Sequence, residues 1–151
     1  MSKYTLDTNV LIDALRVPEE LAALKAFLER ALPVCYLSGI VVQELEAGVT
    51  TRAQAELIAD QLVGPFARRG RVIAPSAEAW ARSGQVLWQL RRQHRGTLPA
   101  SLANDALLAC SCREAGITLI TRDNDFHRLG RHVSGLQLSV PYPKPPVRRG
   151  A

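Results

Sequence analysis

Short apolar runs alternate along the chain with longer stretches of helical periodicity. Residues 4–6, 34–38 and 117–121 are apolar runs that end at polar residues or glycine. Such short, bounded runs are typical of buried strands. Residues 71–74 and 136–140 are weaker strand candidates. The pattern therefore predicts up to five strands, each separated from the next by helical sequence.

The segments between these runs carry helix signals. Helices are expected over residues 10–16, 18–32, 51–63, 77–93 and 102–115, and a helix is also expected around residue 44. Ser76 and Ser101 are expected to be N-caps, because a serine hydroxyl can accept a hydrogen bond from a free amide of the first turn. Gly116 is expected to end the last of these helices. Gly64 and Pro65 are expected to stop the helix over residues 51–63.

Strands that alternate with helices predict a three-layer α/β/α sandwich with a mostly parallel central sheet. A chain of 151 residues suits one domain. We assign residues 1–140 to this domain and residues 141–151, which hold four prolines, to a tail that is extended or disordered. No apolar run approaches the ~20 residues of a membrane helix, and the start does not resemble a signal peptide. A cytoplasmic location is the expectation.

Composition narrows the possible chemistry. The net charge is +5, and 16 of the 19 basic residues are arginine, which binds phosphate as a bidentate fork. This charge fits a nucleic-acid partner, and it fits a solvated basic surface equally well. The three cysteines lack CxxC spacing, which argues against a disulfide framework or a zinc knuckle. Buried free thiols are expected instead.

Carboxylates follow the predicted strands. Asp7 comes directly after the first strand, and Asp123 and Asp125 follow the strand over residues 117–121. Ligands of open α/β sheets bind outside the carboxyl ends of the strands, so these acids are expected at one edge. Asp105 lies near the start of a predicted helix, and Glu44 follows the second strand closely enough to face the same edge.

Each aspartate has an ordinary explanation when taken alone, because aspartate is common in helix caps and turns. Glu44 differs, because an ionised glutamate among so many apolar neighbours is costly without a partner. Together these acids repel, since two unit charges 4 Å apart cost about 4 kcal/mol at an effective dielectric constant of 20. A hard divalent cation such as Mg²⁺ or Mn²⁺ removes this repulsion and prefers oxygen ligands. His94, His127 and His132 have no zinc-like spacing to the acids and are expected at the surface.

Four segments, in this order, resemble the acidic motifs of the PIN-domain nucleases. They are LDTNVLID at residues 6–13, VVQELEAG at 41–48, NDALLA at 104–109 and LITRDNDF at 119–126. One such motif is weak, whereas four in order over residues 4 to 140 are specific. The small single-domain form is similar to the VapC-type toxins of bacterial toxin–antitoxin pairs.

The resemblance implies an endoribonuclease that depends on Mg²⁺ or Mn²⁺. It makes Asp7, Glu44 and Asp105 metal ligands, with Asp123 as first choice and Asp125 as second choice for the fourth acid. Supporting roles fall to Thr8, Asn9 and Thr121. The arginines that could hold flanking RNA phosphates, or could equally be solvated surface residues, are Arg91, Arg92, Arg95 and Arg122, together with Arg68, Arg69 and Arg71.

The same resemblance implies a small antitoxin protein as partner and a homodimer. The apolar first half of the chain, including residues 10–15 and 21–32, offers surface for either contact, and core packing is the alternative that explains most of these residues. Other classes lack their motifs: no GxGxxG follows the first strand, and Asn9 stands where a haloacid-dehalogenase-type phosphatase needs a second aspartate. The main alternative is a catalytically inactive PIN-like module that binds RNA or protein.

Overall fold

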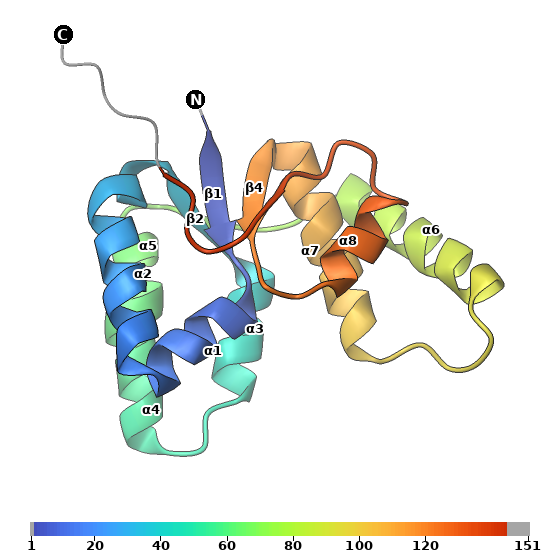
Figure 1. Cartoon of the computed structure of the whole chain (residues 1–151). Coiled ribbons are helices and arrows are strands. Elements are labelled where there is room, and N and C mark those ends of the chain that lie inside the picture. Colours follow the sequence, from blue (N-terminus) through green and yellow to red (C-terminus); the bar gives the residue numbers. More distant parts are fainter. Residues whose placement is uncertain (1, 145–151) are drawn as a thin grey trace, which may run out of the picture.

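The computed structural model describes residues 2–144 and is built around one parallel sheet (Figure 1). The strands are β1 (Lys3–Leu6), β2 (Cys35–Ser38), β3 (Val72–Ile73), β4 (Ile117–Ile120) and β5 (Leu138–Ser139). Their order is β3-β2-β1-β4-β5, and every neighbouring pair is parallel. The first strand therefore lies at the centre, and the strand order reverses beside it, between β1 and β4.

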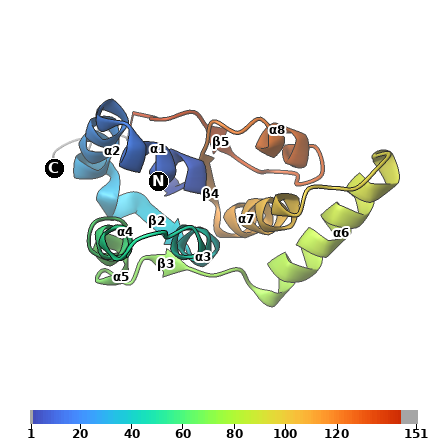
Figure 2. The ribbon, with the colours of Figure 1, turned by 90° about the horizontal axis from the view of Figure 1, so that it is seen from below.

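Helices cover both faces of this sheet. They are α1 (Thr8–Arg16), α2 (Pro18–Ala31), α3 (Gly39–Ala47), α4 (Arg52–Leu57), α5 (Gly64–Ala67), α6 (Ala77–Gln93), α7 (Ser101–Ala115) and α8 (Asp125–Gly130). Two further helical segments, the 3₁₀-helix η1 (Leu32–Val34) and the π-helix η2 (Ile58–Val63), precede β2 and α5. Figure 2 shows α1, α2, α4 and α5 on one side of the sheet and α6 and α7 on the other. The predicted three-layer α/β/α sandwich is confirmed.

The two central strands form the most deeply buried part of the core. Leu6, Leu119 and Ile120 have no exposed surface, as expected for parallel strands with helices on both faces. Leu6 is paired with Ile120, and the Asp7 amide donates to the Ile120 carbonyl at 3.0 Å. This register brings the residues after β1 and β4 out of the sheet side by side.

The prediction that Gly64 and Pro65 stop the helix over residues 51–63 was wrong, because helical structure continues from α4 through η2 into α5. The segment η2 is a π-helix, which shifts the hydrogen-bond pattern. Pro65 then lies in the first turn of α5, where a missing amide hydrogen is tolerated. Gly64 allows a close approach, since a Cβ at this position would lie 2.7 Å from the Ala59 carbonyl oxygen.

The predicted helix ends were otherwise of mixed accuracy. Ser76 caps α6 as expected, with its hydroxyl accepting from the Ala79 amide at 3.0 Å, and Gly116 ends α7 at a φ of 64°. Ser101 is not a cap: it is the first residue of α7, and its helix begins on a backbone turn in which the Leu102 amide donates to the Pro99 carbonyl. The helix α8 was not predicted.

The tail and the thiols complete the fold. Tyr142 stacks on Phe27 with ring centroids 5.2 Å apart, so the described start of the expected tail packs on α2. Residues 145–151 of that tail lie outside the described residues. The three cysteines are buried and free, as predicted. In the part of the chain that the structure describes, no helix combines the length and apolar character that crossing a membrane requires.

Candidate metal centre

Asp7 is a buried carboxylate fixed by the neighbouring strand. Only 4% of its surface is exposed, and its Oδ2 accepts a hydrogen bond of 2.8 Å from the Thr121 hydroxyl. It precedes α1 directly, yet its side chain makes no capping hydrogen bond, so helix capping does not explain it. Burial raises the pKa of Asp7 to about 6, against the lowering effect of the Thr121 hydrogen bond.

Glu44 reaches the same edge from α3. The Ser38 hydroxyl at the end of β2 caps α3 by accepting from the Ile40 amide at 3.2 Å, which starts the helix directly after the strand. The Thr8 hydroxyl donates to Glu44 Oε1 at 3.0 Å and holds the partly buried carboxylate in place. Glu46, two residues further along α3, is exposed to solvent.

Three aspartates form the tightest acidic group. Asp105, Asp123 and Asp125 each offer a carboxylate oxygen, and these three atoms lie within 4.8 Å of one another. The loop after β4 shapes the group: the Asp123 amide donates to the Thr121 hydroxyl, and the Asp125 amide donates to Asp123 Oδ1, both at 2.9 Å. The Thr121 hydroxyl therefore fixes Asp7 by donating a hydrogen bond to it, and fixes the Asp123 loop by accepting a hydrogen bond from it.

The acids act on one another electrostatically. The pKa of Asp105 is raised to about 7, first by burial and then by the negative charges of Asp7, Asp123, Glu44 and Asp125. Asp123 and Glu44 also raise the pKa of Asp7. All five predicted acids thus contribute to one negative field, which a divalent cation would neutralise.

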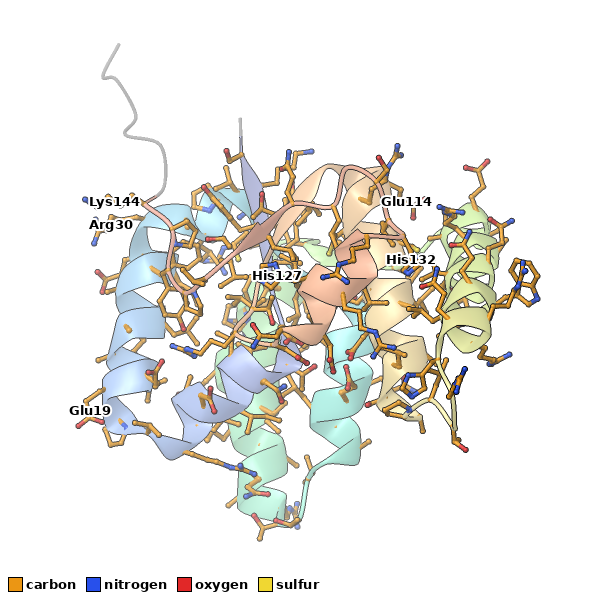
Figure 3. All side chains as sticks on the ribbon, turned by 45° about the vertical axis from the view of Figure 1, so that its right-hand side comes forward. Glu19, Arg30, Glu114, His127, His132 and Lys144 are labelled. Atoms are coloured by element: carbon orange, nitrogen blue, oxygen red, sulfur yellow. The ribbon has the colours of Figure 1, made fainter. Side chains whose placement is uncertain are left out.

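The donor set fits a hard cation. Within residues 2–144, the group that gathers potential metal-binding side chains contains aspartates and neither histidine nor cysteine. Carboxylate oxygens suit Mg²⁺ or Mn²⁺, whereas zinc sites usually include nitrogen or sulfur ligands. His127 is an exposed residue of α8, and His132 lies just after that helix and is half-buried (Figure 3).

Other predicted residues lie outside this group. Asn9 is exposed, whereas Thr8 and Thr121 both donate to acids of the site. Arg122 donates to Asp13 at 3.4 Å and to Glu20 at 2.7 Å, so it ties the acidic loop to α1 and α2. The pairing of Arg122 with Asp13 and Glu20 was not predicted, because the spacing of these three residues in the sequence does not indicate a contact. The exposed arginines at the end of α6 are Arg91, Arg92 and Arg95.

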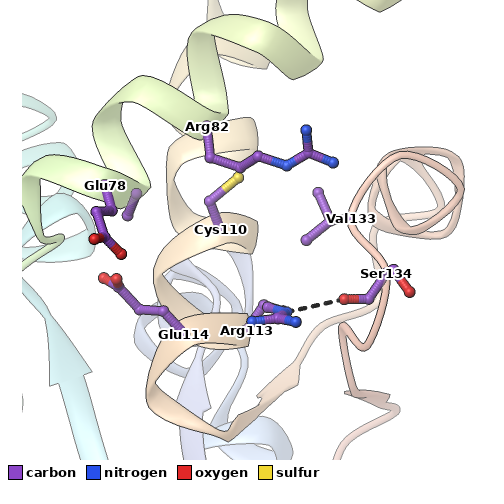
Figure 4. Close-up of a pocket in the computed structure, with 8 residues that line it drawn as sticks. Glu78, Arg82, Cys110, Arg113, Glu114, Val133 and Ser134 are labelled. Carbon is purple, nitrogen blue, oxygen red and sulfur yellow. Dashed lines mark hydrogen bonds between the residues drawn. The ribbon is translucent and has the colours of Figure 1, made fainter.

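A cavity of about 340 Å³ between α6 and α7 does not include the acids (Figure 4). Three of its four charged side chains bond to neighbouring segments, Glu78 being the fourth. Arg113 Nε donates to the Ser134 carbonyl at 3.0 Å, and Arg82 donates to the His132 carbonyl at 2.9 Å. Glu114 accepts from the amide and hydroxyl of Ser76. These bonds join α6, α7 and the segment after α8, so the cavity belongs to the packing of the fold.

The fold is that of a known family. The family model of the PIN domain matches residues 4–132, and the chain belongs to this family. No curated protein sequence matches the chain.

Several solved structures share the fold. They include FitAcB from Neisseria gonorrhoeae, at a TM-score of 0.64 and 23% identity over 91% of this chain and 97% of that chain. DNA-bound VapBC from Salmonella typhimurium has a TM-score of 0.67 and 22% identity over 93% and 98%. VapBC2 from Rickettsia felis, bound to a fragment of its promoter DNA, has a TM-score of 0.65 and 21% identity over 91% and 97%. At this identity the likeness concerns the fold.

Proposed function

We propose that the protein is a divalent-metal-dependent endoribonuclease that acts in the cytoplasm as the toxin of a toxin–antitoxin pair. One observation carries the proposal: five carboxylates from four distant segments meet at the carboxyl edge of the sheet, and burial and mutual repulsion raise the pKa values of Asp7 and Asp105. Membership of the PIN domain family supports a nuclease rather than a structural cluster.

The carboxylates supply the ligands of the proposed metal. Asp105, Asp123 and Asp125 are close enough to share one ion, and Asp7 and Glu44 complete the negative field around them. Mg²⁺ or Mn²⁺, when bound, supplies positive charge for the phosphoryl group and acidifies a water molecule.

The chain's own residues order this site. Thr121 holds the carboxylate of Asp7, and Thr8 holds that of Glu44, so two ligands on different elements keep fixed orientations. Fixed ligands reduce the reorganisation that charge development in the transition state would otherwise require. Arginines on the surrounding surface, within a chain of net charge +5, attract the RNA backbone that the acids alone would repel.

The proposed partner is a small antitoxin, and the proposed assembly includes a homodimer of this chain. An apolar groove of about 350 Å³ between α1, α2 and the α4–η2 segment supports a protein contact, with Leu15, Leu21 and Leu57 among its lining residues. The solved structures with this fold include the complexes named VapBC.

The experiment is an RNA cleavage assay with purified protein, with and without Mg²⁺ or Mn²⁺. We expect metal-dependent cleavage by the wild type and by Asp60→Asn, which changes an exposed aspartate of η2, and none by Asp7→Asn. Calorimetry should show metal binding that Asp105→Asn weakens. Equal behaviour of wild type and Asp7→Asn, with no metal binding, would identify an inactive RNA-binding or protein-interaction module instead.

A further inference from the structure

The outer face of α6 carries both tryptophans of the chain. Trp80 is 61% exposed and Trp88 is 55% exposed, which is unusual for the largest apolar side chain. They are separated by about 12 Å along the helix, at 1.5 Å per residue. Between them lies Gly84, where an added Cβ would have no neighbour within 4 Å, so the surface between the rings is open.

Positive charge lies on the same face. Arg91 and Arg92 share with the two tryptophans an arc of about 120° around the helix axis, at 3.6 residues per turn. Arg95 follows two residues after the end of α6 at Gln93 and extends the basic stretch. The guanidinium of Arg92 lies over the Trp88 ring at 4.8 Å from its centroid. No acidic residue occurs in the sequence between Glu78 and Asp105.

This face is connected to the candidate metal centre. In Figure 1, α6 forms one edge of the molecule, and its last residues lead through a loop into α7, which carries Asp105. A second connection runs through α8: its first residue is Asp125, and Arg128 Nη2 lies 3.5 Å from His94 Nδ1, the residue that follows α6. Arg128 thus links the helix that begins at Asp125 to the end of α6.

We propose that this face, defined by Trp80, Trp88, Arg91, Arg92 and Arg95, binds single-stranded RNA that flanks the scissile bond by stacking bases on the two indoles. Exposed aromatic rings interleaved with arginine are the surface that single strands recognise, because every base has a stacking face and every nucleotide a phosphate. The helix dipole accounts for cations in the last turn of α6, but it does not account for two exposed indoles.

The inference rests on the proposed ribonuclease function, but its test needs no cleavage. In EDTA, a single-stranded oligouridylate of about ten nucleotides is titrated into the wild-type protein, and tryptophan fluorescence and the anisotropy of a labelled oligonucleotide are recorded. Since the only tryptophans lie on this face, quenching reports contact there. We expect quenching, and a loss of affinity of roughly five- to a hundredfold for Trp88→Ala and for Trp80→Ala.

Matched variants separate stacking from charge. Trp88→Phe keeps an aromatic ring and should retain most of the affinity that Trp88→Ala loses. Arg92→Gln should weaken binding and flatten its salt dependence. Arg52→Gln removes the same charge from an exposed position on α4 and should bind like the wild type.

Each other outcome overturns the proposal. Absence of quenching together with unchanged affinity of both tryptophan-to-alanine variants would show that RNA does not bind this face. A change of molecular mass in those variants, with unchanged affinity for RNA, would make the face a contact between copies of the chain. If the wild type cleaves RNA but either of these two outcomes is found, only this inference fails. If RNA stacks on this face but no metal-dependent cleavage is found, only the proposed function fails.

Discussion

Asp105→Asn should stabilise the metal-free protein at alkaline pH while strongly weakening its response to metal. The native state holds the proton of Asp105 more tightly than the unfolded chain does, because its pKa rises from 3.8 to about 7. The stabilisation that goes with this proton is complete below pH 3.8 and disappears as the pH rises through about 7. At pH 8 the charged carboxylate therefore destabilises the native state.

The size of the effect depends on the change in pKa. At 1.36 kcal/mol per pH unit, the difference corresponds to about 4 kcal/mol. Asp105 is partly exposed, and solvent screening reduces the effect to about 2 kcal/mol. For a domain of this size, about 2 kcal/mol raises the melting temperature by roughly 4–8 °C.

The assay is thermal and urea unfolding in EDTA at pH 4.5 and pH 8, on wild type, Asp105→Asn and the control Asp60→Asn. At pH 8 we expect Asp105→Asn to be the most stable, with the difference shrinking at pH 4.5. Addition of Mg²⁺ or Mn²⁺ should stabilise the wild type by mass action and leave Asp105→Asn nearly unchanged. The difference in stability between the two proteins at pH 8 should therefore become smaller or change sign. Equal stabilities of wild type and Asp105→Asn at both pH values would refute the description of a repulsive, buried acidic site.

Three further substitutions test the residues in and beside β4 that support the site. Thr121→Val removes the hydroxyl that donates to Asp7 and accepts from the Asp123 amide; urea unfolding should show a loss of about 1–3 kcal/mol, and unchanged stability would contradict the role of this hydroxyl. Gly116→Ala forces a side chain into a φ of 64°, and the melting temperature should fall by the equivalent of about 1 kcal/mol, since no steric clash adds to the strain. Leu119→Ala leaves a cavity in the fully buried β4, and a loss smaller than about 2 kcal/mol in urea would argue against the tight packing described for the central strands.

The sheet and the acidic edge could be predicted because both depend on local signals. Short apolar runs mark strands, and parallel topology places the residues after β1 and β4 at one edge. Asp7 and Asp123 needed no further information to be placed together. Their hydrogen bonds to Thr121 fit the supporting role that the resemblance implies for this threonine, although the spacing alone gives no distance.

Two features could not be predicted, one because it is an irregular local helix geometry and one because it depends on a contact between distant segments. The α4–η2–α5 segment continues past Gly64 because a π-helix changes the register, and propensity reasoning applied to an α-helix cannot anticipate this. The pairing of Arg122 with Asp13 and Glu20 requires that the loop after β4 lies beside α1 and α2. Such a contact exists only once the sheet order is known.

The central strands also explain how the fold tolerates its acids. Asp7 and the Asp123 loop are attached to β1 and β4, whose side chains Leu6, Leu119 and Ile120 are fully buried. Burial of each such side chain contributes about 1.5–3 kcal/mol, which offsets part of the repulsion between the carboxylates that the strand pair brings together. A cation that removes this repulsion binds the folded chain in preference to the unfolded one. If the candidate site binds such a cation, metal binding and folding are coupled through the same residues, and stability measured against metal concentration tests the site.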